Sequence, residues 1–151
     1  MKVNVDAAVS KNAGRASAAA VARDANGLFL GASAVVMTGM TDPETIEVLA
    51  CREGVALAQD LLLSRIRLAS DCSNAVGNIR TGAERGIYGA VIKEIKEMAR
   101  VFQTIDFVHE SRSSNIDAHV LAKSSLFDAI GRHVWFLDPP YGVCNNLFNV
   151  S

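Results

Sequence analysis

The sequence predicts an α/β domain with a five-stranded mixed sheet and helices on both faces of the sheet. Residues 3–37 form three runs of strand-like composition joined by short turns, which indicates an antiparallel meander. Residues 45–130 then alternate between helix-like and strand-like segments, the pattern of parallel strands added to a sheet. Half of the 151 residues are hydrophobic, enough for the core of one domain.

The first strand, at residues 3–9, contains an unexpected acidic residue. Val3, Val5 and Val9 share one side of it, and Asp6 stands on the other side near the middle. Because aspartate is disfavoured in strands, Asp6 needs a structural or functional explanation. The second and third strands are predicted at 16–23 and 28–37, joined by the hairpin sequence Asp-Ala-Asn-Gly.

Residues 45–58 predict a helix that packs closely on the sheet. Thr41, Asp42 or Pro43 opens it, and Glu47 lies within its apolar run. The residues that share the face of Glu47 are small or apolar: Ala50, Cys51, Gly54 and Ala58. A carboxylate on such a face needs a charged partner or a metal, because burying an unpaired charge is costly.

The rest of the chain continues the alternation and ends in a tail. The predicted elements are a strand at 64–70, a helix at 74–81 capped by Ser73 or Asp71, a loop at 81–89, a helix at 91–99, a strand at 102–109, a polar loop at 111–114 and a helix at 115–130. We expect one domain over residues 1–131. Residues 132–151 are expected to form an irregular tail on or behind it, because prolines 139 and 140 interrupt regular structure.

Three carboxylates are expected to meet in this arrangement. If the first and fourth strands are parallel neighbours, Asp6 approaches Asp71, and Glu47 joins them from the covering helix. Each also has a structural alternative: Asp6 as a turn-facing aspartate, Glu47 as a partly solvated helix residue, and Asp71 as a helix cap alone.

Four segments in order resemble the motifs of a known family. They are VNVDAAV at 3–9, EVLACREGVALA at 47–58, ASDCSNAV at 69–76 and SRSSNIDAHVLAK at 111–123. Together they resemble the ribonuclease H domain of the plant reverse-transcriptase-like subgroup, over residues 3–129. The resemblance implies a ribonuclease H-like fold. It also implies endonucleolytic hydrolysis of the RNA strand of an RNA–DNA hybrid, dependent on Mg²⁺ or Mn²⁺.

The resemblance also implies roles for individual residues. Asp6, Glu47 and Asp71 match three catalytic, metal-binding carboxylates of the family. His119 stands where the family has a fourth, and Asp117 lies two residues earlier, on the wrong side of a helix. Because imidazole binds Mn²⁺ better than Mg²⁺, we expect a weakened second metal position and a preference for Mn²⁺. His109 is a structural histidine or a proton shuttle.

The substrate surface is harder to predict, because a net charge of −1 gives no global attraction to nucleic acid. The candidate nucleic-acid-binding residues are Arg80, Arg85, Lys93, Lys96, Arg112 and Asn115. The lysines also fit a solvated helix face, since Glu94 and Glu97 are interleaved with them. The alternative function is therefore a non-catalytic nucleic-acid-binding domain with a weakened metal site.

The surroundings of the protein are only broadly predictable. No apolar run approaches membrane-spanning length, and the first residues lack the apolar core of a signal peptide. The three cysteines lack metal-ligand spacing and fit a reducing compartment. We expect an intracellular monomer whose partner is nucleic acid rather than a membrane.

Overall fold

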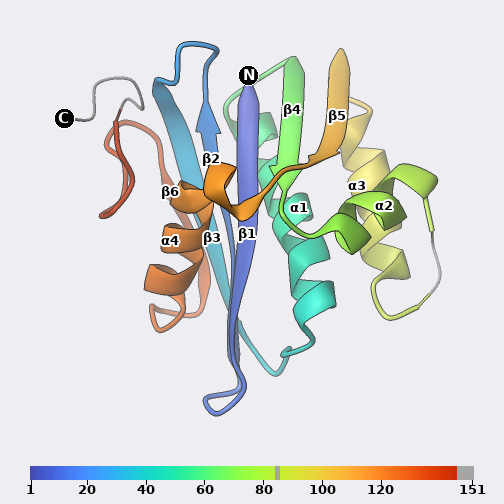
Figure 1. Ribbon diagram of the computed structural model, residues 1–151, viewed down its shortest axis with the longest axis vertical. Coiled ribbons are helices and arrows are strands. Elements are labelled where there is room, and N and C mark those ends of the chain that lie inside the picture. Colours follow the sequence, from blue (N-terminus) through green and yellow to red (C-terminus); the bar gives the residue numbers. More distant parts are fainter. Residues whose placement is uncertain (84–85, 146–151) are drawn as a thin grey trace.

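The computed structural model describes residues 1–83 and 86–145, which form a six-stranded mixed sheet with helices on both faces (Figure 1). The strands are β1 (Lys2–Ser10), β2 (Arg15–Arg23), β3 (Phe29–Thr38), β4 (Arg65–Ser70), β5 (Thr104–His109) and β6 (Gly131–Trp135). The helices are α1 (Pro43–Asp60), α2 (Ser73–Thr81), α3 (Gly89–Ala99), α4 (Ile116–Ser125) and the short 3-10 turn η1 (Arg112–Ser114).

The sheet has the order β5-β4-β1-β2-β3-β6 and contains the predicted meander. β1 pairs with β2, and β2 with β3, in antiparallel fashion, whereas β4 joins β1 and β5 in parallel. The predicted contact between the first and fourth strands is therefore confirmed. Their last register pair is Val5 with Ser70, so β1 continues past the end of β4 from Asp6 onward.

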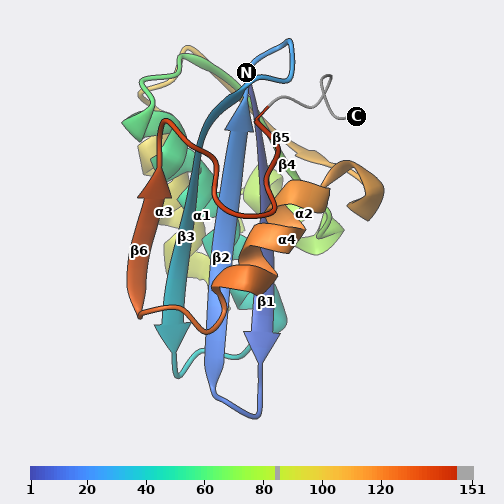
Figure 2. The ribbon, with the colours of Figure 1, turned by 90° about the vertical axis from the view of Figure 1, so that its left-hand side faces the viewer.

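The helices form two layers around the sheet. Figure 2 shows α4 in front of β1 and β2, with α1 and α3 behind the sheet. On the α1 side the core contains Val3, Val5 and Leu68, and on the α4 side it contains Leu121 and Ala122. A Cβ atom at Gly54 would lie only 2.6 Å from Val5 Cγ1. The predicted close packing of this helix face is confirmed, because a larger residue would push α1 off the sheet.

The C-terminal part of the fold differs from the sequence prediction. The expectation that residues after 131 are irregular is wrong for 132–135, which lie in β6 antiparallel to β3. This sixth strand satisfies backbone groups that an edge strand would otherwise expose. The final helix is also shorter than 115–130, since α4 ends at Ser125.

The first residues of α1 and α2 differ in how they are capped. Asp42 caps α1, accepting a hydrogen bond from the Thr45 amide at 3.0 Å, and Pro43 follows at the first helical position. For α2 the cap position is Cys72, without a side-chain hydrogen bond. Capping by Ser73 or Asp71 is therefore wrong. None of the helices in the described ranges is long and apolar enough to cross a membrane.

Candidate metal centre

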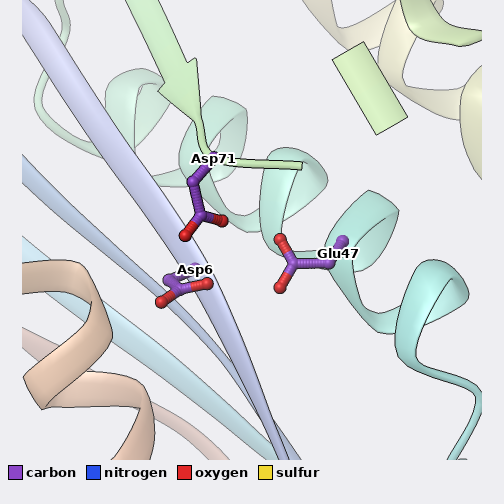
Figure 3. A group of neighbouring side chains, drawn as sticks. All are labelled: Asp6, Glu47 and Asp71. Atoms are coloured by element: carbon purple, nitrogen blue, oxygen red, sulfur yellow. The ribbon is translucent and has the colours of Figure 1, made fainter. Parts of the chain in front are cut away.

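Three carboxylates from three different elements meet at one edge of β1. Figure 3 shows the side chains of Asp6 from β1, Glu47 from α1 and Asp71 from the end of β4 turned toward one another. One oxygen from each lies within 4.8 Å of the other two. Like charges at this separation repel, so a cation between them is favourable.

The geometry of the two parallel strands explains how the carboxylates meet. β4 stops pairing with β1 at Ser70, and Asp71 is the next residue. Asp6 likewise comes directly after Val5, the last residue of β1 paired with β4. Side chains from both layers can therefore reach Asp6, which is only 3% exposed.

Glu47 carries the clearest electrostatic signal in the site. Within residues 1–83 and 86–145, its Oε2 atom is buried and has no hydrogen-bond partner. Burial, followed by the negative charges of Asp6 and Asp71, raises the pKa of Glu47 to about 9. A buried oxygen without a partner, facing two more carboxylates, fits a divalent cation with oxygen ligands. The Glu47 side chain as a whole is half-buried, in keeping with a partly solvated helix residue, but its Oε2 atom is buried among the carboxylates.

His119 reaches the same site from the opposite layer. Its Nδ1 atom lies 2.8 Å from Asp6 Oδ2, and the other Asp6 oxygen accepts a hydrogen bond from the Ala7 amide at 2.9 Å. Asp117 instead forms an ion pair with Arg23. The prediction that Asp117 is on the wrong side of the helix is confirmed, and His119 is the α4 side chain beside Asp6.

Asn115 and Arg112 lie next to the site in different ways. Asn115 is 1% exposed; it donates to the Val5 carbonyl at 2.8 Å and accepts a bond from Asn4 at 2.8 Å. Its amide therefore fixes the start of α4 on β1 instead of facing solvent, which corrects its expected place on the binding surface. Arg112 is exposed, and its Nε atom lies 3.5 Å from Asp71 Oδ2.

The other candidate binding residues lie on α2 and α3. Arg80, Lys93 and Lys96 are exposed, and the Lys96 ammonium lies beside Gly82 at the end of α2. Glu94 and Glu97 pair with Arg52 and Arg100, so they do not pair with the two lysines. Arg85 lies outside the described residues. His109 ends β5 and is exposed.

Sequence reasoning missed two groups of polar residues near the centre. Asn4, two residues before Asp6 on the same face of β1, binds both Ser114 O and Asn115. Tyr88 donates a hydrogen bond to Glu44 at 2.9 Å and accepts one from Asn78 at 2.6 Å, which joins α1, α2 and the start of α3. The position of Asn4 beside Asp6 was a usable signal, whereas the Tyr88 contacts depend on packing between helices.

Comparisons with known proteins agree with this geometry. RNase H1 from Halobacterium salinarum is 20% identical, with a TM-score of 0.76 over 85% of this chain and 98% of that one. The N-terminal RNase H domain of Rv2228c from Mycobacterium tuberculosis is 20% identical, with a TM-score of 0.72 over 82% and 92%. LC11-RNase H1 in complex with an RNA/DNA hybrid is 16% identical, with a TM-score of 0.66 over 83% and 95%.

Comparison at the level of sequence gives one family match. A search among curated proteins found no match. The reverse transcriptase-like family matches residues 4–125, which include Asp6, Glu47, Asp71 and His119. This span covers most of the chain, and of the four segments of the sequence resemblance it omits only Val3. The chain therefore belongs to the reverse transcriptase-like family and has the ribonuclease H-like fold.

Proposed function

We propose that this protein is a metal-dependent endonuclease that hydrolyses the RNA strand of RNA–DNA hybrids. The observation that carries the proposal is the meeting of Asp6, Glu47 and Asp71 within 4.8 Å, with a buried Glu47 oxygen that lacks a partner in the described chain. The fold shared with RNase H proteins supports the same substrate class, since one of those structures contains an RNA/DNA hybrid.

In the proposed reaction, Asp6, Glu47 and Asp71 hold Mg²⁺ or Mn²⁺. Divalent ions held by carboxylates stabilise charge on the attacking and leaving oxygens of a phosphodiester. The two strands and the helix that carry these side chains are packed in the core, which keeps the carboxylate spacing fixed. His119 holds Asp6 in place through its Nδ1 atom.

The replacement of a fourth carboxylate by His119 sets the metal preference that we propose. A neutral imidazole adds no negative charge, and both Asp6 oxygens already accept or share hydrogen bonds. A second Mg²⁺ is therefore held less well than in a site with four carboxylates. Mn²⁺ tolerates nitrogen ligands better, so we expect higher activity in Mn²⁺.

The proposed hybrid-binding surface consists of exposed basic residues on α2, α3 and η1. Lys93, Lys96 and Arg80 face solvent, and Arg112 lies beside Asp71. Arg85 remains a predicted member of this surface. Asn115 contributes by position, because it holds α4 and therefore His119 on β1. A few such contacts in a near-neutral chain favour weak, salt-dependent binding by a monomer.

A second candidate is a nucleic-acid-binding domain without catalysis. The contact between His119 and Asp6 favours this second candidate. The family resemblance leads one to expect another carboxylate at position 119, but the imidazole there occupies an oxygen of Asp6 instead of adding a metal ligand of its own. Such a domain would keep the exposed basic surface, and its affinity for the hybrid would not depend on divalent metal.

Cleavage of a labelled RNA–DNA hybrid in Mg²⁺ or Mn²⁺ separates the two candidates. Single-stranded RNA and duplex RNA serve as substrate controls, and Asp6→Asn is the matched protein control, since it keeps the shape of the side chain. The nuclease proposal expects cleavage of the hybrid that disappears in correctly folded Asp6→Asn. Full activity in that variant, or metal-independent binding without cleavage, would overturn it.

A further inference from the structure

A cleft lies close to the carboxylates, on the α4 face of the sheet. It is a cleft of about 760 Å³ formed around the starts of β1 and α4, together with the β2–β3 turn and Cys144. Its volume falls within the range of about 300–1,000 Å³ that is typical of ligand sites. We call it the β1–α4 cleft.

The β1–α4 cleft lies next to the metal centre along β1. Asn4 lines the cleft and points to the same face of β1 as Asp6. Asp6 is two residues later in the strand, which corresponds to about 7 Å along β1. Asn115 marks the boundary, since it contacts Asn4 and binds the carbonyl of Val5. A nucleic-acid strand that leaves the carboxylates beside Arg112 can therefore enter the cleft after one or two nucleotides.

Arg67 is a basic residue of the cleft that remains available to an anion. Lys2 and Arg67 are register partners on β1 and β4, and both line the cleft. Lys2 pairs with Glu110 at 2.5 Å, whereas the Arg67 guanidinium makes no hydrogen bond or ion pair with the residues that the structure describes. Arg67 stands on the face opposite Ile66 and Leu68, which are buried under α1.

The acidic residues near the cleft have other partners or stay unpaired, and none that the structure describes forms an ion pair with Arg67. Asp117 is neutralised by Arg23, and Asp24 accepts hydrogen bonds from the amides of Asn26 and Leu28. Asp106 is the register partner of Arg67 on β5, and it is exposed on the same face of the sheet. Asp106 therefore weakens the field of Arg67 without forming an ion pair with it.

The remaining walls suit a flat, partly apolar body. Met1 and Ile116 line the cleft and are 50% and 59% exposed, so they offer apolar surface to a ligand. Ser113, Ser114 and Asn4 add hydrogen-bonding groups on the same side. Apolar walls for a base, amide and hydroxyl groups for its edge or sugar, and arginine for a phosphate together match a nucleotide.

We propose that the β1–α4 cleft binds one or two unpaired nucleotides of a strand that continues from the metal centre. The inference rests on the proposed nuclease function for the identity of the strand, but the cleft and its charges are independent of catalysis. Arg67 holds a phosphate, and Met1 and Ile116 pack against a base. The protein then accepts hybrids with a single-stranded flank as well as fully paired ones.

Binding of a fluorescent four-nucleotide oligouridylate to the Asp6→Asn protein tests the cleft without cleavage. We expect Arg67→Glu to weaken this binding by about tenfold, the effect of losing one charge-assisted phosphate contact. Ile116→Ala should also weaken it, and Asp106→Asn should strengthen it by removing the charge that opposes Arg67. Lys123→Glu, an exposed change of the same charge near the end of α4, is the control and should leave the affinity within about twofold, since Lys123 does not line the cleft and exposed charges are screened by salt.

The outcomes separate this inference from the proposed function. A protein that cleaves no hybrid but binds the oligouridylate through Arg67 keeps the cleft and loses the nuclease proposal. A protein that cleaves hybrid, but whose Arg67→Glu and Lys123→Glu variants bind the oligouridylate equally, loses the cleft. Absence of oligouridylate binding at millimolar concentration also overturns the inference.

Discussion

The Nδ1 atom of His119 on α4 lies 2.8 Å from Oδ2 of Asp6 on β1, which links the helix on one face of the sheet to a carboxylate that also meets α1 on the other. The side chain of Asp6 is thereby held between an imidazole and two carboxylates. This contact restricts the orientation of Asp6, and it places an imidazole ring where an additional negative charge would strengthen cation binding.

Replacing His119 with a carboxylate should improve the response to Mg²⁺. We expect His119→Asp to raise Mg²⁺ affinity by about tenfold and to raise Mg²⁺-dependent cleavage toward the Mn²⁺ level. Stability without metal should fall, because a further carboxylate joins those of Asp6 and Asp71. Calorimetric titration and hybrid cleavage measure these effects, with His119→Asn as the uncharged control. Equal Mg²⁺ affinity in the two variants would show that His119 does not limit the site.

The metal-free protein should lose stability as the pH rises. The pKa of Glu47 is raised from 4.5 to about 9, so between these values the folded protein keeps a proton that the unfolded chain has released. The free energy of unfolding then falls with pH, by up to about 1.4 kcal/mol per pH unit from this one group. Urea denaturation in a chelator from pH 5 to 9 measures the slope. Glu47→Gln should flatten it, and an unchanged slope in that variant would contradict the assignment.

Metal binding should release a proton from Glu47. Because the pKa of Glu47 is about 9 without metal, the group is protonated at pH 7, whereas metal ligation requires the carboxylate. Calorimetry of Mn²⁺ binding in two buffers with different ionisation enthalpies should show release of about one proton per protein. Glu47→Gln, which carries no titratable proton at this position, is the matched control and should release none from it. A parent protein that binds Mn²⁺ without proton release would contradict this prediction.

The basic face of α3 should contribute to binding without sequence preference. Lys93 and Lys96 are exposed and lie one turn apart. Reversing both to Glu should weaken binding of all hybrid sequences alike and should reduce the slope of log affinity against log salt by about 0.7–0.9 per lost contact. Anisotropy at several salt concentrations measures both effects, with Lys123→Glu for comparison. Unchanged affinity would remove α3 from the binding surface.

The sixth strand should depend on one buried ion pair. Arg132 on β6 binds Glu53 on α1 at 2.6 Å and Asp60 at 2.6 Å, and Glu53 is 4% exposed. Arg132→Ala leaves Glu53 buried without its partner. We expect a loss of roughly 2–3 kcal/mol, below the value for a fully buried pair because the Arg132 side chain is 36% exposed. Thermal denaturation measures the loss, and the double change Glu53→Leu with Arg132→Met should recover much of it.

Local sequence patterns were sufficient for most of the sheet and for the three central carboxylates. Alternation in β1 separated Asp6 from the valines, and helical spacing placed Glu47 above Gly54 on the buried face of α1. Both patterns depend on neighbours within a few residues, which the sequence shows directly. The positions of Arg80, Lys93 and Lys96 on exposed helix faces followed from the same periodicity.

Contacts between distant segments were decided only by the tertiary structure. The meander, the close-packed helix and the placement of Asp6 within a strand, Glu47 on a helix and Asp71 after a strand could be predicted from the sequence, because they follow from local propensity and spacing. The sequence did not determine that residues 131–135 pair with β3, that Asn115 is buried against Val5, or that His119 touches Asp6 across 113 positions of the chain. Such contacts depend on how the layers pack and which polar groups are left to be satisfied, and no short stretch of sequence contains that information.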